Sequence, residues 1–283
     1  MKVDFFNENG FGLIGYPLGH SMSGIIHNEL FKISGIASTY NMIEVEPENL
    51  KEVFDAKLKK LRGFNVTIPH KINIIPLLDE LSPRAKLFGA VNTVDVREDK
   101  IVGHNTDCSG FLRALDMAGI ELAGSVLLCG SGGVSRMFAF ESILAEADLT
   151  IAVRKEDIES AQTIKKEIAQ KLGRDCKVIL LSEAQGNYDL IINGTPVGMY
   201  PNVNACPLDK AVIQSSKAVF DAVYNPEQTQ FIKYAKEAGL KYSNGLPMLV
   251  WQAAVAEEIW NGVKFKKEDI QKIIEITQKE LNR

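Results

Sequence analysis

The stretch SVLLCGSGGVSRMFAFESILAEADLTIAVRK, residues 125–155, decides the fold. The apolar run SVLLC predicts a buried strand, and the letters GSGG that follow predict a tight turn. A helical pattern comes next, and LTIAV predicts a second strand that ends before Arg154 and Lys155. Strand, glycine turn, helix and strand in this order indicate the βαβ unit of dinucleotide-binding proteins.

The glycine turn suits a pyrophosphate. Gly130, Gly132 and Gly133 allow the backbone to turn tightly and to approach a ligand closely. The helix that follows offers unpaired N–H groups and the positive end of its dipole. The alternative is a tight turn between strand and helix that binds nothing.

The choice of cofactor is expected at the end of the second strand, where an acidic side chain would bind a ribose 2′-hydroxyl. Here the strand ends in Arg154 and Lys155, and two cations suit a 2′-phosphate. NADP is therefore favoured over NAD. Glu156 and Asp157 follow at once, and in the alternative reading they pair with these cations at a solvated helix start.

Strands and helices alternate along the rest of the chain, as in parallel-sheet α/β proteins. Strands are predicted near 11–15, 39–45, 62–68, 90–96, 177–180, 188–192 and 218–221. Helical patterns cover 22–34, 47–60, 71–89, 109–119, 229–239, 246–261 and 267–281, and 97–100 predicts a turn. The fold class is α/β with two domains, an N-terminal α/β substrate domain and a doubly wound Rossmann-like domain that binds NADP.

The last two helices have no further strand to join, so we expect them to return to the first domain. Residues 1–106 and 245–283 then form the substrate-binding and catalytic domain, and residues 107–244 form the dinucleotide-binding domain. This division predicts a cleft between two lobes, a common place for ligands of α/β proteins.

Composition excludes several classes of function. The 283 residues are 46% hydrophobic, enough for a packed core in about two domains, and the net charge of −4 argues against nucleic acid or an anionic membrane as partner. A small-molecule substrate is expected instead. The sequence does not decide the oligomeric state, and we keep a homodimer as a candidate assembly.

The stretch MKVDFFNENG has no apolar core, and no segment reaches the roughly 20 apolar residues that span a bilayer, so we expect a cytoplasmic protein. The four cysteines form no CxxC pair and are expected to be reduced. The four histidines, all within the first 104 residues, lack the spacing of metal ligands, so no metal is expected.

A second informative stretch is NVTIPHK, residues 65–71. Its alternation suits a strand with one buried face, and Pro69 ends that strand because proline cannot donate to the ladder. Lys71 follows directly. A lysine at such a place is usually a solvated loop residue, so other parts of the chain must decide its role.

Polar clusters of this kind recur in the first domain where a hydrophobic pattern predicts none: GYPLGHSMSGIIHN, FNVTIPHK, AVNTV and GHNTDCSG. Three further motifs follow along the chain: NGTPVGM, FDAVYNPEQT and NGLPMLVWQAA. Together they resemble the shikimate dehydrogenase family, and the likeness covers almost the whole chain. The resemblance implies NADPH-dependent, reversible reduction of 3-dehydroshikimate to shikimate.

The resemblance also implies roles for individual residues. Lys71 and Asp107 match the catalytic pair of the family. Substrate binding is implied for Ser21, Ser23, Thr67, Asn92, Tyr224 and Gln252, the serines and Thr67 with Tyr224 at the carboxylate and the two amides at the ring hydroxyls. Cofactor binding is implied for Gly130, Ser131, Gly132, Gly133, Val134, Arg154, Lys155, Thr195, Met199 and Gly245.

Each of these side chains has a structural alternative. Ser21, Ser23 and Asp107 are each suited to a helix N-cap, Thr67 to a plain strand position and Tyr224 to a rim. Asn92 is suited to closing a turn, and the amide of Gln252, on an apolar helical stripe, needs a partner such as a backbone carbonyl. These alternatives stay open at the level of sequence.

The chain departs from the family pattern at three places. Val153 stands where the family's NADP enzymes usually have Asn, which makes nucleotide discrimination less secure than the chemistry. Ser131 and Cys108 replace a common Ala and Gly. Two rival functions are a quinate/shikimate dehydrogenase that uses NAD, and a non-catalytic nucleotide-binding regulatory protein of the same fold.

Overall fold

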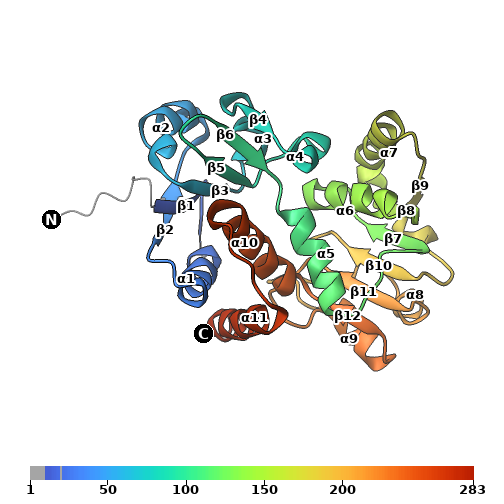
Figure 1. Cartoon of the computed structure of the whole chain (residues 1–283). Coiled ribbons are helices and arrows are strands. Elements are labelled where there is room, and N and C mark those ends of the chain that lie inside the picture. The colour runs from blue at the N-terminus through green and yellow to red at the C-terminus, as the bar shows by residue number, and fades with distance from the viewer. Residues whose placement is uncertain (1–9, 20) are drawn as a thin grey trace. The chain divides into compact units, whose positions relative to one another are not determined.

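The computed structural model describes residues 10–19 and 21–283, and Figure 1 follows the chain through them. The predictions made from the first nine residues, and His20, lie outside the described residues. The chain divides into two compact units, Met1–Gly110 with Leu249–Arg283 and Phe111–Met248. Both boundaries fall inside helices, namely α5 (Asp107–Met117) and α10 (Gly245–Asn261).

The first unit contains a six-stranded sheet in the order β2-β1-β3-β5-β6-β4. Its strands are β1 (Gly10–Gly15), β2 (Thr39–Glu44), β3 (Gly63–Val66), β4 (Glu80–Leu81), β5 (Thr93–Val96) and β6 (Ile101–His104). β1 is parallel to β2 and β3, whereas β5 is antiparallel to β3 and β6. No strand was predicted at residues 101–104. They form strand β6, because the predicted turn at 97–100 is short enough to join only antiparallel strands.

The helices of this unit are α1 (Ser23–Ser34), α2 (Leu50–Ala56), α3 (His70–Asn73), α4 (Pro83–Phe88) and α11 (Lys267–Leu281), together with most of α10. The helical pattern over 71–89 is interrupted, because Pro76 and Pro83 have no N–H to donate. Pro83 begins α4 instead, after the N-cap Ser82. α11 contacts α1 (Figure 1), so the C-terminal helices return to the first unit as predicted.

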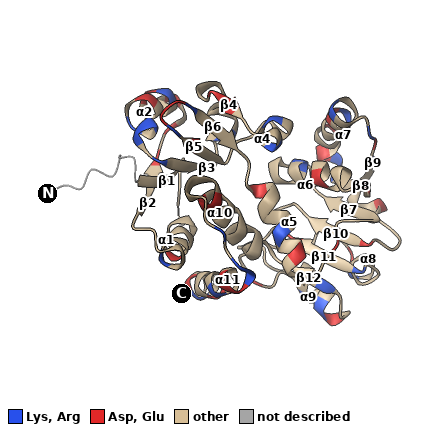
Figure 2. Ribbon diagram, viewed as in Figure 1, with Lys and Arg blue, Asp and Glu red and all other residues tan. Residues whose placement is uncertain are grey.

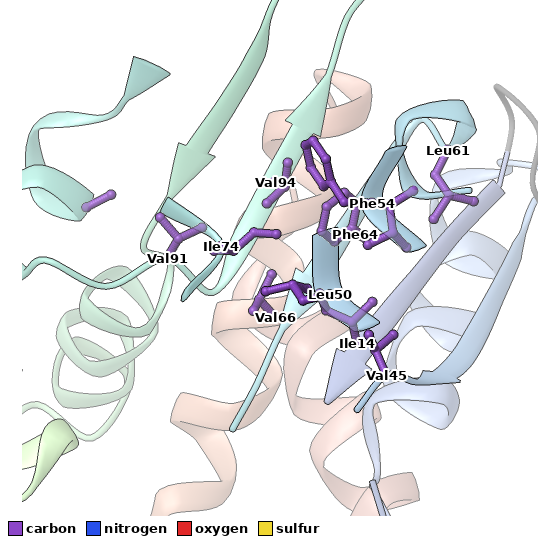
Figure 3. Packing of buried hydrophobic residues seen from close by; sticks show 12 residues of the cluster. Ile14, Val45, Leu50, Phe54, Leu61, Phe64, Val66, Ile74, Val91 and Val94 are labelled. Carbon is purple, nitrogen blue, oxygen red and sulfur yellow. The ribbon is translucent and has the colours of Figure 1, made fainter. Parts of the chain in front are cut away.

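A hydrophobic cluster holds the first sheet against α2 and the segment after β3. Ile14, Phe64 and Val66 contribute from the strands, and Phe54 and Ile74 pack against them, all at most 1% exposed (Figure 3). This packing fixes the ends of β1 and β3, where the segments that carry Thr67 and Lys71 begin.

The carboxyl end of α10 is anchored to the sheet by polar contacts. Trp260 is fully buried and donates from Nε1 to the carbonyl of Val94 at 2.9 Å. Arg62 donates to the carbonyl of Trp260 and also to Asp95, at 2.7 Å in the latter case. A Cβ atom on Gly63 would lie against the Trp260 indole nitrogen, well inside contact distance. The helix that carries Gln252 therefore has a defined position on the sheet.

The second unit contains a six-stranded, parallel sheet in the order β12-β11-β10-β7-β8-β9. Its strands are β7 (Ser125–Cys129), β8 (Asp148–Val153), β9 (Lys177–Leu180), β10 (Leu190–Asn193), β11 (Ala218–Asp221) and β12 (Lys241–Ser243). Its helices are α6 (Gly133–Leu144), α7 (Ile158–Leu172), α8 (Lys210–Gln214) and α9 (Gln230–Glu237). The predicted doubly wound, two-domain α/β fold is confirmed, with β12 as an additional edge strand.

The order of strands reverses between β7 and β10, and such switch points are where open α/β sheets bind ligands. Phe111, Phe138 and Phe220 pack within 4.5–5.6 Å between ring centroids and form an aromatic core beside these strands. Figure 2 shows charged residues on α7 and α9, whereas the strands are mostly free of them. Apolar packing in the interior of this unit therefore holds β7 and β10, the strands at the switch point, in place.

We expect Gly63→Ala to lower the free energy of unfolding by about 1–3 kcal/mol, the usual cost of overpacking a core. The indole of Trp260 cannot move aside without losing its hydrogen bond to Val94. Urea unfolding measures the change. Gly24→Ala is the control, because a Cβ at Gly24 meets no atom within 4 Å. Equal stability of the two variants would contradict the anchoring role of Trp260.

Candidate active site

Lys71 lies in the short helix α3, shortly after strand β3. Its carbonyl accepts a hydrogen bond from Val91 N at 2.8 Å, which holds this turn beside the segment that carries Asn92. The Lys71 side chain is 32% exposed and forms an ion pair, so it is not a solvated loop lysine. Its ammonium is held in place and still reachable by a ligand.

The carboxylate of Asp107 accepts hydrogen bonds on both oxygens. Lys71 Nζ donates to Oδ2 at 2.6 Å, and Asn92 Nδ2 donates to Oδ1 at 2.8 Å. The prediction that Asp107 is the N-cap of its helix is wrong, because α5 begins at Asp107 itself. The carboxylate is directed toward Lys71 and Asn92.

Asn92 connects this carboxylate to neighbouring groups. Its Oδ1 accepts from Thr106 N at 2.7 Å, so it does not close the turn that was considered for it. Gln252 Oε1 lies 3.5 Å from Asn92 Nδ2 and from Thr106 Oγ1. Gln252 Nε2 donates to the carbonyl of Leu249 at 3.0 Å, which confirms the expected backbone partner. We call the resulting set the Lys71 cluster: Lys71, Asn92, Asp107 and Gln252.

Ser21 and Ser23 are hydrogen-bonded to each other at the start of α1. The two hydroxyl oxygens lie 3.1 Å apart, and Ser21 Oγ accepts from Ser23 N at 3.3 Å. The N-cap position is occupied by Met22, which makes no side-chain cap, so the prediction of a plain capping serine is wrong. Two hydroxyls therefore stand together at an uncapped helix start.

Thr67 and Tyr224 lie in different units. Thr67 follows β3 and donates from its backbone N–H to the carbonyl of Ile14 at 2.9 Å. Tyr224 follows β11 in the second unit, and burial raises the pKa of its hydroxyl, which is therefore a neutral hydrogen-bond donor. Thr67 belongs to the same unit as the Lys71 cluster and the two serines, and Tyr224 does not.

The glycine turn between β7 and α6 has two kinds of glycine. Gly130 has φ +103°, and a Cβ there would lie 2.7 Å from Thr195 Cγ2, so the protein itself requires glycine. Gly132 and Gly133 are exposed, and a Cβ at either would meet no atom within 4 Å. Packing against the described residues does not require glycine at these two positions, whereas close approach by a ligand would.

The start of α6 fits a phosphate group. Gly132 is the N-cap and makes no side-chain cap hydrogen bond, so the first N–H groups of the helix have no side-chain partner there. Ser160 donates to the carbonyl of Ser131 at 3.1 Å and holds the turn against α7, and Val134 is the second residue of α6. These residues are suited to the pyrophosphate of a dinucleotide.

Arg154 follows β8, where the 2′-substituent of a dinucleotide is recognised. Its guanidinium pairs with Asp157 at 2.8 Å and with Glu156 at 3.3 Å, which is the alternative arrangement considered from sequence. Arg154 is 64% exposed, so a phosphate can still reach it. Lys155 is also exposed, and no ion pair joins it to any of the described residues.

The remaining predicted cofactor residues stand at strand ends. Thr195 follows β10 beside the glycine turn and donates from Oγ1 to Asn193 Oδ1 at 2.6 Å. Met199 is 46% exposed in the same loop. Gly245 begins α10, and its Cβ would collide with the carbonyl of Ala222, so its glycine is explained by packing.

Asp221 is a buried carboxyl group that the sequence analysis did not single out. It accepts from Asn193 Nδ2 at 2.9 Å, from Val223 N at 3.1 Å and from Thr229 Oγ1. Asn193 in turn holds Thr195, so Asp221 positions the loop beside the glycine turn. The signal available in the sequence was the polar residue at the end of each of two neighbouring apolar strands, β10 and β11.

Other polar residues of the site were also missed. Thr93 and Thr106 bond to Asn92, and Asn65 bonds to Thr93 at 2.9 Å. Each stands in a polar motif already noted, one or two positions from a residue that was assigned. Within residues 10–19 and 21–283, no group of three or more His, Cys, Asp or Glu side chains is arranged to hold a metal ion.

A parallel sheet with an open glycine turn at its switch point, and a lysine paired with a carboxylate, are features typical of NAD(P)-dependent oxidoreductases. Comparison with known proteins gives the particular family. The model of the shikimate dehydrogenase substrate binding domain matches residues 13–94, and that of the shikimate 5'-dehydrogenase C-terminal domain matches residues 245–275. The chain belongs to the shikimate dehydrogenase family.

Relatives match almost the full length. The shikimate dehydrogenase (NADP(+)) of Methanocaldococcus jannaschii is 44% identical over 89% of this chain and 91% of its own. The crystal structure of a shikimate dehydrogenase in complex with NADP+ has a TM-score of 0.86 and 40% identity, covering 94% of both chains. A chorismate mutase/shikimate 5-dehydrogenase fusion protein from Clostridium acetobutylicum has a TM-score of 0.87 and 38% identity, covering 98% of this chain and 99% of that one.

None of the helices in the described part of the chain combines the length and the apolar character needed to cross a membrane. The four cysteines are not joined by disulfides.

Asp221 gives a pH-dependent contribution to stability. Burial raises the pKa of its carboxyl from 3.8 to about 6, so the folded protein keeps a proton that the unfolded chain releases. The contribution is complete below pH 3.8 and is lost as the pH rises through about 6.

We therefore expect Asp221→Asn to remove this dependence. The difference in unfolding free energy between the wild type and the variant should fall between these pH values, by at most about 1.4 kcal/mol per pH unit. Urea unfolding from pH 4 to 7 measures it, and Asp148→Asn, at an exposed carboxylate, controls for loss of one charge. A difference that does not vary with pH would contradict the assignment.

Proposed function

We propose that this protein catalyses the reversible, NADPH-dependent reduction of 3-dehydroshikimate to shikimate. The observation that carries the proposal is the Asp107 carboxylate, bonded at 2.6 Å to Lys71 and at 2.8 Å to Asn92 in a chain of this family. An ammonium, a carboxylate and an amide held together recognise a substrate that has both a ketone and neighbouring hydroxyls.

NADPH, when bound, supplies the hydride for the ring ketone. The carbonyl oxygen then gains negative charge, which the Lys71 ammonium stabilises as it donates a proton to that oxygen. Asp107 holds the amine in position and accepts a hydrogen bond from the adjacent substrate hydroxyl. Because Lys71 is partly exposed, solvent can restore its proton.

The other side chains bind the substrate. Asn92 and Gln252 bond the ring hydroxyls, and Ser21, Ser23 and Thr67 bond the carboxylate at the start of α1. The role of Tyr224, which lies in the second unit, stays a prediction from the sequence. For the cofactor, the residues at the amino end of α6 would hold the pyrophosphate, Arg154 and Lys155 would hold the 2′-phosphate, and Thr195 and Met199 would complete the binding site.

An enzyme that uses NAD and accepts quinate is the second candidate. The pairing of Arg154 with Glu156 and Asp157 favours it, because carboxylates compete with a 2′-phosphate for the guanidinium. A non-catalytic nucleotide-binding protein is the third. A homodimer and a cytoplasmic location stay predictions from the sequence.

Oxidation of shikimate and of quinate, each with NADP+ and with NAD+, separates these candidates. We expect shikimate with NADP+ to give the highest kcat/KM, measured by nicotinamide absorbance. Preference for NAD+ with quinate would support the second candidate. Binding of NADP+ without turnover of either acid would contradict an enzymatic function.

Lys71→Ala should lower kcat about 100-fold or more with a smaller change in KM, because acid–base assistance is typically worth that factor. Steady-state kinetics at saturating NADP+ measure the loss. Lys86→Ala, at an exposed lysine of the same unit, is the matched control. Turnover of the Lys71 variant near that of the control would rule out the proposed role.

A further inference from the structure

The loop of residues 194–199 follows β10 at the switch point of the second sheet, and its first residue packs on α6. Gly194 N donates to the carbonyl of Cys129, at the end of β7, at 2.9 Å, and the carbonyl of Gly194 accepts from Ser135 Oγ at 2.9 Å. A Cβ atom at Gly194 would collide with the side chain of Ser135. The start of the loop is therefore fixed against the helix that begins at the glycine turn.

Asn193 holds the middle of this loop with both ends of its side-chain amide. Its Oδ1 accepts from Thr195 N at 3.0 Å and from Thr195 Oγ1 at 2.6 Å. Its Nδ2 donates to the carbonyl of Val197 at 3.3 Å. Asn193 is fully buried, so the loop folds around this one amide from outside.

Asp221 determines which way the Asn193 amide points. At pH 8, above its pKa of about 6, the Asp221 carboxyl is ionised and only accepts hydrogen bonds. The group that faces Asp221 Oδ1 at 2.9 Å is therefore the NH2 group of Asn193, and the amide oxygen of Asn193 faces Thr195. Val223 N at 3.1 Å and Thr229 Oγ1 hold the carboxylate itself in place.

The single hydrogen atom of the Thr195 hydroxyl is already used inside the loop. It is donated to Asn193 Oδ1, while the hydroxyl oxygen accepts from Val197 N at 3.2 Å. The methyl group of Thr195 lies against Gly130, where a Cβ would be 2.7 Å from Thr195 Cγ2. Thr195 therefore sets the distance between the loop and the glycine turn.

The far end of the loop packs on the same hydrogen-bonded network. Gly198 has φ +94°, and a Cβ there would lie 3.2 Å from Thr229 Cβ. Thr229 is the residue that donates to Asp221 Oδ2. The Asp221 carboxylate is thus connected to the loop through Asn193 and through Thr229, and a fully satisfied buried network of this kind favours one arrangement.

We propose that Asn193 and Asp221 are positioning residues, which hold the loop 194–199 beside the glycine turn in the form that binds NADP. This inference rests on the proposed function. Both side chains are fully buried, so they act on a ligand only through the loop. A loop that is shaped before the ligand arrives loses less conformational entropy on binding, so loss of the network should weaken binding.

Asn193→Ala tests the proposal through binding, without turnover. We expect the Kd for NADP+, measured by isothermal titration calorimetry at pH 8, to rise about tenfold, the effect of losing about two hydrogen bonds. Asn187→Ala, at an exposed asparagine of the same unit, is the matched control. Equal values of Kd for Asn193→Ala and this control would overturn the proposal.

Two substitutions of Asp221 separate positioning from a general loss of stability. Asp221→Ala should raise the Kd for NADP+ by a similar factor, whereas Asp221→Asn should keep it within about twofold of the wild type. The amide oxygen of the Asn variant still accepts from Asn193, and its NH2 group donates to Thr229 Oγ1. Both variants are measured well below their unfolding temperatures. Equal values of Kd for the two would overturn the proposal.

Thr195→Val decides the matter if Asn193→Ala does not fold, because it keeps the methyl group against Gly130 and removes only the hydroxyl. The Kd for NADP+ should rise about fivefold, and an unchanged Kd would overturn the proposal. In the Asn193→Ala background the further rise should be less than about twofold, because the partner of the hydroxyl is absent, and an equal rise in both backgrounds would also overturn it.

The same titrations distinguish this inference from the proposed function. Wild-type protein that does not bind NADP+ would contradict the proposed function. Normal binding by the wild type and by Asn193→Ala alike would contradict only the positioning role of Asn193 and Asp221.

Discussion

The carboxylate of Asp107 is the interaction on which the first unit's polar interior depends. A partly buried charge is tolerated only when its oxygens are bonded, and here Lys71 and Asn92 take one oxygen each. The side-chain oxygen of Asn92 in turn accepts a hydrogen bond from Thr106. Thr93 is hydrogen-bonded to Thr106 and to Asn65. The same bonds that make burial acceptable hold an ammonium and an amide at fixed separation, so the folding requirement and the arrangement for chemistry coincide.

Much of the fold follows from local patterns in the sequence. Residues 125–155 form strand, turn, helix and strand as predicted, because a glycine turn between two apolar runs has few other solutions. The segment 71–89 was harder, since its apolar residues suit a helix while Pro76 and Pro83 interrupt one. β6 and the edge strand β12 were missed because strands of three or four residues carry little pattern of their own. Their partners in the sheet, not their residues, determine them.

The site was predictable where residues stand in a motif and not where they are joined only by folding. Lys71, Asn92, Asp107 and Gln252 come from four separate segments, and resemblance to the family was needed to connect them. Ser21 and Ser23 were likewise assigned only through the resemblance, because two serines before a helix are as easily explained as helix caps. The capping role considered for Asp107 failed for a local reason. The helix begins one residue earlier than a capping aspartate requires.

At Gly132 and Gly133 the requirements of the protein's own packing and the requirements of ligand access are separate, although in most proteins they coincide. Neither glycine is needed by the chain's own packing, so side chains at these positions leave the folded molecule intact and obstruct only what approaches from outside. Selection for solubility or expression would not remove such substitutions. Among natural variants, substitutions at these two positions would therefore reflect changes in ligand binding and not changes in folding.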